Sequence, residues 1–186
     1  FGYDTVSYRV FGSEAADTAT VSITVTAVND APVASADTVT TNEDNDYTGT
    51  LSASDVDGDA LTYSVLTSPV NGTISITSSS SGTYTYSPTA NYNGNDSLTF
   101  TASDGTLLDT AKVSITVTAV NDAPVASAST VTTNEDTDYS GTLSASDVDG
   151  DALTYSVTTS PSNGTATVTD STSGTYTYSP TANYNG

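Results

Sequence analysis

The chain has 186 residues, with 22 acidic side chains against two basic ones and a formal net charge of −20. Because only Arg9 and Lys112 are cationic, the composition excludes nucleic acid and anionic membrane surfaces as direct partners. Cys, His, Met and Trp are absent, which excludes disulfides, thiolate or imidazole metal sites and imidazole acid–base chemistry. No nucleophile, base and orienting partner form a recognisable set, so we expect no enzyme.

Membrane insertion is excluded by the distribution of apolar residues. No stretch approaches the roughly 18 consecutive apolar residues of a membrane-spanning helix. No basic-then-apolar leader follows Phe1. We therefore expect any targeting signal to lie outside this sequence.

The sequence repeats itself after 92 residues, without insertion or deletion. Residues 29–94 match residues 121–186 at 56 of 66 positions. A fixed long period indicates an array of similar modules. We expect residues 1–28 to be the last two strands of a preceding module, 29–120 a complete module, and 121–186 the first five strands of a following one.

Short runs rich in Val, Ile, Thr and Tyr follow one another along the complete module, and no helical periodicity is present. Alternation places one side chain in two on a buried face, including Leu51, Ala53, Leu61, Tyr63, Val65, Ile74, Ile76, Leu98, Phe100, Val113, Ile115 and Val117. The expected strands are 33–41, 46–54, 61–66, 73–77, 82–87, 96–103 and 111–119. Seven antiparallel strands in about 90 residues are typical of an immunoglobulin-like sandwich. We predict an all-β chain of tandem seven-stranded Greek-key sandwiches with negligible helix.

Acidic residues gather at the turns of this predicted sandwich. Successive loops of antiparallel strands lie at opposite ends. This places Asp104 and the turn 55–59, which carries Asp55, Asp57 and Asp59, at the end where a linker enters. Glu43 lies in a turn at the opposite end of the module, beside the linker that begins at Asn121. The boundary after the complete module therefore combines Glu43, and Asp96 as a weaker candidate, with Asn121, Asp122, Asp147, Asp149 and Asp151.

Clustered carboxylates repel one another unless they are protonated or bind a multivalent cation. A site made only of oxygen ligands favours calcium, which takes six to eight oxygens in irregular geometry, over magnesium. An EF-hand is rejected, because Ala60 and Leu66 replace its required Gly and Glu. The alternative is ordinary turn chemistry, in which Asp and Asn bind their own backbone.

Three segments carry a family resemblance. The turn 102–105 (ASDG), the strand 113–117 (VSITV) and the linker 120–124 (VNDAP) resemble the F–G turn, G strand and Asn-Asp linker of cadherins. The chain is most similar to the cadherin-like tandem repeats of large secreted bacterial adhesins. That resemblance implies calcium at module junctions, stiff extracellular arrays, and a role in cell-surface attachment, biofilm or matrix.

The resemblance also implies a ligand set. At the first boundary it maps to Asn29, Asp30, Asp55, Asp57 and Asp104, and at the second to Glu43, Asn121, Asp122, Asp147 and Asp149. Asp59 and Asp151 join these sets by their place in the same turns. The sequence departs from the family where Ala31 and Ala123 replace a second linker Asn, and where Gly12 stands at the position of Asp104.

Two other functions remain open at this stage. Residues 1–28 of a neighbouring copy are able to complete the module 121–186 by strand addition, which would make the chain a filament subunit. Tyr84 and Tyr86 lie on one face of a strand and would provide a platform for sugar rings in a carbohydrate-binding module, although filling of the core is the commoner explanation for such residues. The expected partners are calcium, neighbouring copies of the same module or chain, and glycans or a cell-surface protein.

Overall fold

The computed structural model describes residues 2–186, and Phe1, the first residue of the expected partial module 1–28, lies outside the described residues. The chain divides into two compact units, a first unit ending at Thr118 and a second unit over Ala119–Gly186. Residues 2–186 form strands, turns and irregular segments without a helix, which confirms the all-β prediction. It follows that no helix of these residues is able to cross a lipid bilayer.

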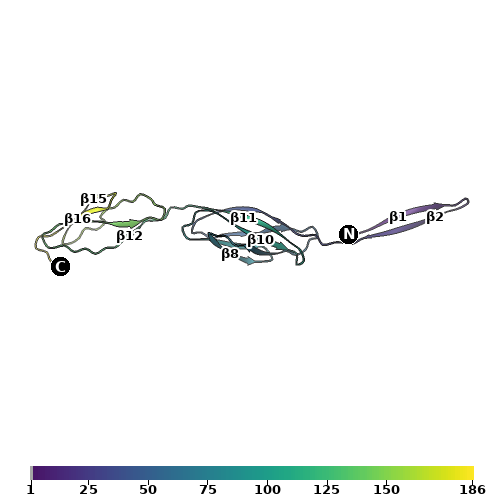
Figure 1. Ribbon diagram of the computed structural model, residues 1–186, viewed down its shortest axis with the longest axis horizontal. Helices are drawn as coiled ribbons and strands as arrows, with labels where there is room; N and C mark the ends of the chain where they lie inside the picture. Colours follow the sequence, from purple (N-terminus) through teal and green to yellow (C-terminus); the bar gives the residue numbers. More distant parts are fainter. Residues whose placement is uncertain (1) are drawn as a thin grey trace. The chain divides into compact units, whose positions relative to one another are not determined.

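The first two strands form a hairpin. β1 (Gly2–Phe11) and β2 (Ala16–Val25) pair antiparallel with each other and with no other strand among the described residues. Figure 1 draws them in purple. Every residue of both strands is exposed to solvent. Because the side chains of this hairpin pack against no second layer in the described structure, the hairpin by itself is expected to be only marginally stable.

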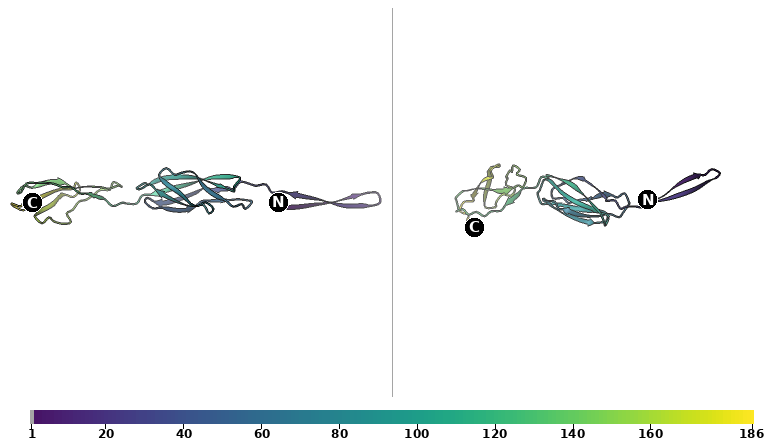
Figure 2. Two further views of the ribbon diagram at one scale, coloured as in Figure 1. Left: turned by 90° about the horizontal axis from the view of Figure 1, so that it is seen from below. Right: turned by 45° about the vertical axis from the view of Figure 1, so that its right-hand side comes forward.

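The rest of the first unit is a two-layer sandwich, whose layers are visible in Figure 2. One sheet has the order β4-β11-β10-β7 and the other the order β5-β9-β8, with β3 and β6 forming a separate pair. The strands are β3 (Val33–Ser35), β4 (Asp37–Asn42), β5 (Tyr47–Thr50), β6 (Ser52–Ser54), β7 (Thr62–Thr67), β8 (Gly72–Ser78), β9 (Thr83–Pro88), β10 (Gly94–Ser103) and β11 (Leu108–Thr118).

Two features of this sandwich differ from the sequence prediction. The expected strand 33–41 is divided into β3 and β4, and the expected strand 46–54 into β5 and β6, because each run leaves one sheet and joins another. Such changes of sheet occur at bends in the strand. In addition, β4 pairs with β11 in parallel rather than antiparallel. Side-chain alternation carries no information on either feature.

The core of the first unit lies between the two sheets. Its most buried side chains are Val39, Leu51, Tyr84, Tyr86, Leu98, Phe100, Val113, Ile115 and Val117. Tyr84 and Tyr86 are 1% and 0% exposed, so their rings fill the core, as the commoner explanation predicts, and offer no platform for sugar rings. The other predicted inward positions, such as Tyr63, Ile74 and Ile76, are partly buried and pack against this cluster.

The second unit repeats part of this sandwich. It contains β12 (Val125–Ser127), β13 (Tyr139–Thr142), β14 (Ser144–Ser146), β15 (Gly164–Asp170) and β16 (Thr175–Pro180). β13, β16 and β15 form one sheet and β12 pairs with β14, as their counterparts do 92 residues earlier. Residues 129–134 and 154–159, the counterparts of β4 and β7, form no strand in the described structure.

Burial of the core tyrosines predicts a loss of stability at alkaline pH. Burial raises the pKa of Tyr84 from 10.0 to about 12, helped by the nearby Tyr47 and Asp37. Burial, and then the hydrogen bond to Asp96, also raise the pKa of Tyr86. Above pH 10 the unfolded chain loses these protons more readily than the folded chain, so the free energy of unfolding should fall as pH rises from about 10 to 12.

Absorbance of tyrosinate at 295 nm, recorded together with far-ultraviolet circular dichroism, checks this expectation. The last absorbance change should coincide with loss of the strand signal, because Tyr84 and Tyr86 are buried in the folded chain. Complete ionisation of all tyrosines near pH 10, with the strands still intact, would contradict the burial of Tyr84 and Tyr86.

Candidate metal site

Three segments of the first unit converge at one end of the sandwich. The loop between β6 and β7 carries Asp55, Asp57 and Asp59, and the turn between β10 and β11 carries Asp104. The end of β10 lies beside the start of β7, because Ser103 is opposite Thr62. The start of β3, which directly follows the linker residues 29–32, lies beside the end of β6. The loop, the turn and the linker are therefore neighbours, as the sequence predicts.

The carboxylates of Asp55, Asp57 and Asp59 form the centre of this end. One oxygen from each lies within 4.8 Å of the others. Oδ1 of Asp55 accepts hydrogen bonds from the backbone N–H groups of Asp57 at 2.9 Å, Gly58 at 3.1 Å and Asp59 at 3.4 Å. Gly58 has φ +81°, a left-handed conformation that glycine adopts without strain and that closes the loop around Asp55.

The second oxygen of Asp55 is the unusual atom of the cluster. Oδ2 is buried and has no hydrogen-bond partner. A buried, unpaired carboxylate oxygen is costly, since it has lost water and gained nothing in exchange. A divalent cation at the triad would supply the missing interaction, and the all-oxygen donor set matches the ligands that calcium prefers. The residues present therefore fit a calcium ion.

The linker is tied to this end by two of its own residues. Oδ2 of Asp57 accepts the backbone N–H of Asp30 at 2.8 Å. The side-chain amide of Asn29 donates to Oδ2 of Asp104 at 2.8 Å and to Oγ1 of Thr106 at 3.0 Å. The conformation of the linker is thus coupled to the two acidic turns.

The turn at Asp104 is held by its own backbone. Oδ1 of Asp104 accepts the N–H groups of Thr106 and Leu107, both at 2.6 Å, and the Thr106 hydroxyl at 2.9 Å. These bonds, with the amide of Asn29, hold the pKa of Asp104 well below its ordinary value of 3.8. Asp104 therefore stays ionised at mildly acidic pH. Sequence reasoning missed Thr106, although its place directly after Asp-Gly is the available signal.

Part of this arrangement recurs in the second unit. Oδ1 of Asp147 accepts the N–H groups of Asp149 at 3.0 Å and Asp151 at 3.3 Å. Oδ2 of Asp149 accepts the linker N–H of Asp122 at 2.7 Å. The amide of Asn121 donates to the carbonyl of Asp122 at 3.1 Å. The bond from linker to loop is thus a repeated property of the module.

Glu43 lies at the other end of the first unit. It follows β4, whose last residue Asn42 is opposite Thr118 at the end of β11. Glu43 is 1% exposed, its N–H donates to the Thr118 carbonyl at 2.9 Å, and its own carbonyl accepts the Asn45 amide at 3.1 Å. The structure does not bring Glu43 to the triad at Asp55, and its role as a ligand of the following boundary stays a prediction.

Two further acids stabilise the sandwich through backbone contacts. The carboxylate of Asp96 accepts the N–H groups of Val70 at 3.0 Å and Asn71 at 2.9 Å, and the hydroxyl of Tyr86 at 3.0 Å. Oδ2 of Asp109 accepts the N–H of Ala34 at 2.9 Å. Sequence reasoning missed the role of both, since their partners lie 25 and 75 residues away.

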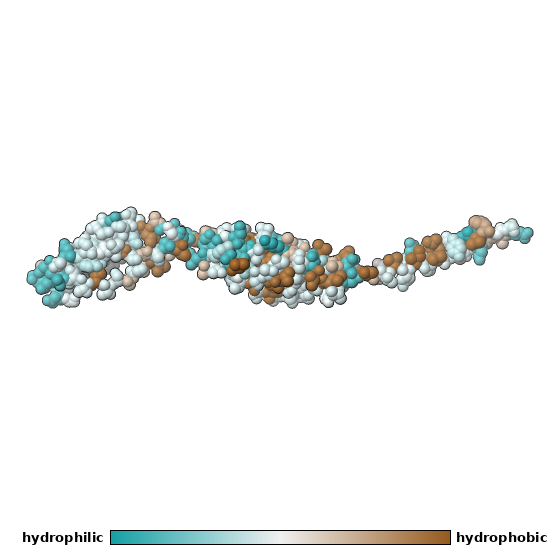
Figure 3. All heavy atoms as spheres, viewed as in Figure 1, coloured by the Kyte–Doolittle hydropathy of each residue, from teal (hydrophilic) through white to brown (hydrophobic). Residues whose placement is uncertain are grey.

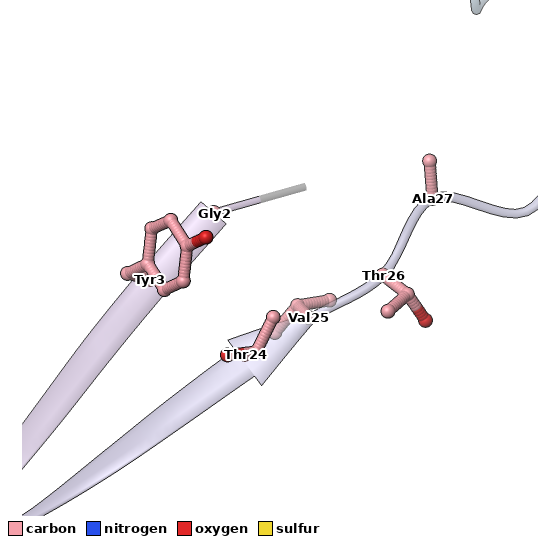
Figure 4. Close-up of a pocket in the computed structure, with 6 residues that line it drawn as sticks. All are labelled: Gly2, Tyr3, Thr24, Val25, Thr26 and Ala27. Carbon is pink, nitrogen blue, oxygen red and sulfur yellow. The ribbon is translucent and has the colours of Figure 1, made fainter.

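A shallow hollow lies at the open end of the first hairpin. It is lined by Gly2, Tyr3, Thr24, Val25, Thr26 and Ala27 (Figure 4), and no charged side chain contributes to it.

Comparison with known proteins agrees with this architecture. A family model described as "Bacterial Ig domain" matches residues 29–116 and 121–186. No curated protein matches the sequence. Together with the structural comparison below, this match confirms the predicted immunoglobulin-like and cadherin-like sandwich.

Solved structures supply the second comparison. Domains EC1-3 of mouse protocadherin-24 are 15% identical with a TM-score of 0.57, over 97% of this chain and 67% of that chain. An endo-fucoidan hydrolase of glycoside hydrolase family 107 is 25% identical with a TM-score of 0.44, over 97% of this chain and 30% of that chain. Drosophila N-cadherin EC1-3 is 17% identical with a TM-score of 0.39, over 56% of this chain and 41% of that chain. The chain thus spans less than a third of the length of the hydrolase.

Proposed function

The chain belongs to the bacterial Ig domain family, and from that premise we propose that it is a calcium-binding extracellular repeat with a structural and adhesive role. Each module would hold calcium at the end where its linker enters. The ligands come from Asp55, Asp57, Asp59, Asp104 and the linker residues Asn29 and Asp30 in the first unit. In the second unit they come from Asn121, Asp122, Asp147, Asp149 and Asp151.

One observation carries this proposal: Oδ2 of Asp55 is buried without a hydrogen-bond partner, in a triad of carboxylates that each place one oxygen within 4.8 Å of the others. Ordinary turn chemistry accounts for Oδ1 of Asp55, which caps the backbone of its own loop. It leaves Oδ2 unexplained. A cation at this place offsets both the repulsion among the three charges and the lost hydration of that oxygen.

Calcium would act on the linker through the residues that contact the acidic loops. Asp30 and Asn29 already bind Asp57 and Asp104, and an ion bound to these carboxylates reduces the freedom of the linker further. For extracellular sites with dissociation constants of about 0.1 to 1 mM, millimolar calcium adds about 0.4 to 1.4 kcal/mol per ion. Several ions along an array of modules would stiffen it, which suits a spacer in cell-surface attachment or matrix.

Calorimetric titration with calcium tests the proposal. The double variant Asp55→Asn with Asp147→Asn removes one negative charge from each acidic loop. Its matched control, Asp46→Asn with Asp138→Asn, makes the same change at the equivalent exposed positions of the turn before β5 and β13. We expect the native chain and the control to bind calcium with similar affinity, and the Asp55 and Asp147 variant to bind at least tenfold more weakly.

Magnesium at the same concentration should give a much weaker signal, because it prefers octahedral geometry and retains its waters. Equal affinity of all three proteins for calcium would show that the ions bind elsewhere on the acidic surface. No binding by the native chain at millimolar calcium would reject the site itself.

A further inference from the structure

We propose that strand β8 of the first unit pairs antiparallel with β8 of a second copy of this chain, about a two-fold axis beside Ser75. The pairing joins the sheet β5-β9-β8 of one copy to the same sheet of the other. The proposal concerns an edge of the complete sandwich and does not depend on calcium.

Strand β8 is an open edge of its sheet. It pairs with β9 on one side and with no strand of the described chain on the other. The carbonyl of Asn71, just before β8, accepts the N–H of Thr89 at 2.8 Å. Backbone groups alternate in direction along an antiparallel strand, and the register shift against β9 comes only after Ile76. The N–H and C=O groups of Ile74 and Ile76 therefore point away from β9, where they form a template for another strand.

The sequence of β8 is complementary to itself. Residues 73–77 read TISIT, the same in both directions. Two copies aligned antiparallel at Ser75 form like pairs: Ser75 with Ser75, Ile74 with Ile76, and Thr73 with Thr77. The two isoleucines face the core, and Ser75 faces solvent. Each cross-strand pair thus joins apolar to apolar or hydroxyl to hydroxyl, which stabilises neighbouring strands.

The distribution of charge favours this edge over the others. Residues 60–95, which include β7, β8 and β9, contain no charged side chain in a chain of net charge −20. Two copies are therefore able to meet along β8 without opposing carboxylates. Of the other edge strands, β4 begins with Asp37 and β5 follows Asp44 and Asp46. β7 is uncharged, but its sequence TYSVLT is not complementary to itself.

Exposed apolar side chains lie beside the open edge. Leu66, on the neighbouring edge strand β7, is 60% exposed, and Val70, in the loop that leads into β8, is 88% exposed. Brown apolar atoms interrupt the hydrophilic surface of the first unit around the place where Figure 1 labels β8 (Figure 3). Apolar surface next to unpaired backbone groups indicates an interaction surface.

The internal repeat shows that the fold does not require this edge to be uncharged and apolar. Ten positions differ between residues 29–94 and 121–186, and seven of them lie within residues 66–80. In the second unit Leu66, Val70, Ile74, Ser75, Ile76, Ser78 and Ser80 are replaced by Thr158, Ser162, Ala166, Thr167, Val168, Asp170 and Thr172. Asp170 places a charge on the edge strand β15, a common protection against edge pairing. The equivalent edge in the first unit carries no such protection.

Sedimentation analysis of the native chain tests the pairing. Raised ionic strength and a chelator are used, because copies of net charge −20 repel one another and because calcium is then excluded as the cause. The average mass should rise with concentration toward twice that of one chain. A single closed pair is expected, because a two-fold contact uses the same edge of both copies.

Charged variants locate the contact. Ser75→Glu places two like charges directly opposite each other at the axis and should weaken association about tenfold or more. The matched control is Thr48→Glu, which should leave association unchanged. Thr48 is exposed and, like Ser75, lies opposite Thr85, but on the other edge of the same sheet. Ser78→Asp, which introduces the residue of the second unit, should also weaken association.

A cysteine at the axis tests the register. The chain has no cysteine, so Ser75→Cys introduces a single thiol. Ser75 would form a non-hydrogen-bonded pair with itself, whose Cα atoms lie about 4.5 Å apart, within the span of a disulfide. With oxidised glutathione, Ser75→Cys should form a disulfide-linked pair about tenfold faster or more than Thr48→Cys. Equal rates, association unaffected by Ser75→Glu, or a native chain of single-copy mass at millimolar concentration would overturn the proposal.

Discussion

Replacing Phe100 with alanine is expected to lower the free energy of unfolding of the first unit by about 3–5 kcal/mol. Phe100 is 0% exposed on β10, and its ring lies 6.2 Å from the ring of Tyr63 on the neighbouring strand β7. The substitution removes a large buried apolar surface and leaves a cavity between the two sheets. Urea unfolding followed by tyrosine fluorescence measures the change.

Two further variants separate packing from strand propensity. Thr99→Ala alters the neighbouring, less buried position of β10 and should cost less than about 1 kcal/mol. Phe100→Leu keeps most of the apolar volume and should cost clearly less than Phe100→Ala. Similar losses for Thr99→Ala and Phe100→Ala would show that the sandwich core is not at Phe100.

Alternation in the sequence predicts the core strands well because each of these strands faces the other sheet along its whole length. Leu98, Phe100, Val113, Ile115 and Val117 are all buried as predicted. The division of the first two expected strands was not predictable, since both halves of a run such as 46–54 keep the same period of two while changing sheet. The parallel pairing of β4 with β11 depends on tertiary contacts that local pattern does not encode.

The acidic cluster was predictable for a related reason. Asp55, Asp57 and Asp59 lie within one short loop, so their spacing alone brings them together. The contacts of Asp96 with Asn71, and of Asp109 with Ala34, join segments far apart in the sequence and use backbone donors, which every residue except proline carries. No residue type marks such a donor, and these structural carboxylates are therefore indistinguishable from metal ligands in the sequence.

The second large effect is expected for Asp96→Ala. This substitution removes the acceptor of the Val70 and Asn71 N–H groups and leaves the Tyr86 hydroxyl with only a long bond of 3.5 Å to the Asn71 carbonyl. Tyr86 is fully buried, so its hydroxyl has no access to water in compensation. Leaving a buried polar group unsatisfied costs about 1–3 kcal/mol, and we expect a total loss of about 2–4 kcal/mol in the free energy of unfolding.

A double-mutant cycle with Tyr86→Phe assigns this loss. Removing the hydroxyl and the carboxylate together should cost less than the sum of the two single changes, with a coupling energy of about 0.5–3 kcal/mol. Asp46→Ala, at an exposed turn, is the control for loss of a negative charge and should be nearly neutral. Strict additivity would mean that Asp96 does not act through Tyr86.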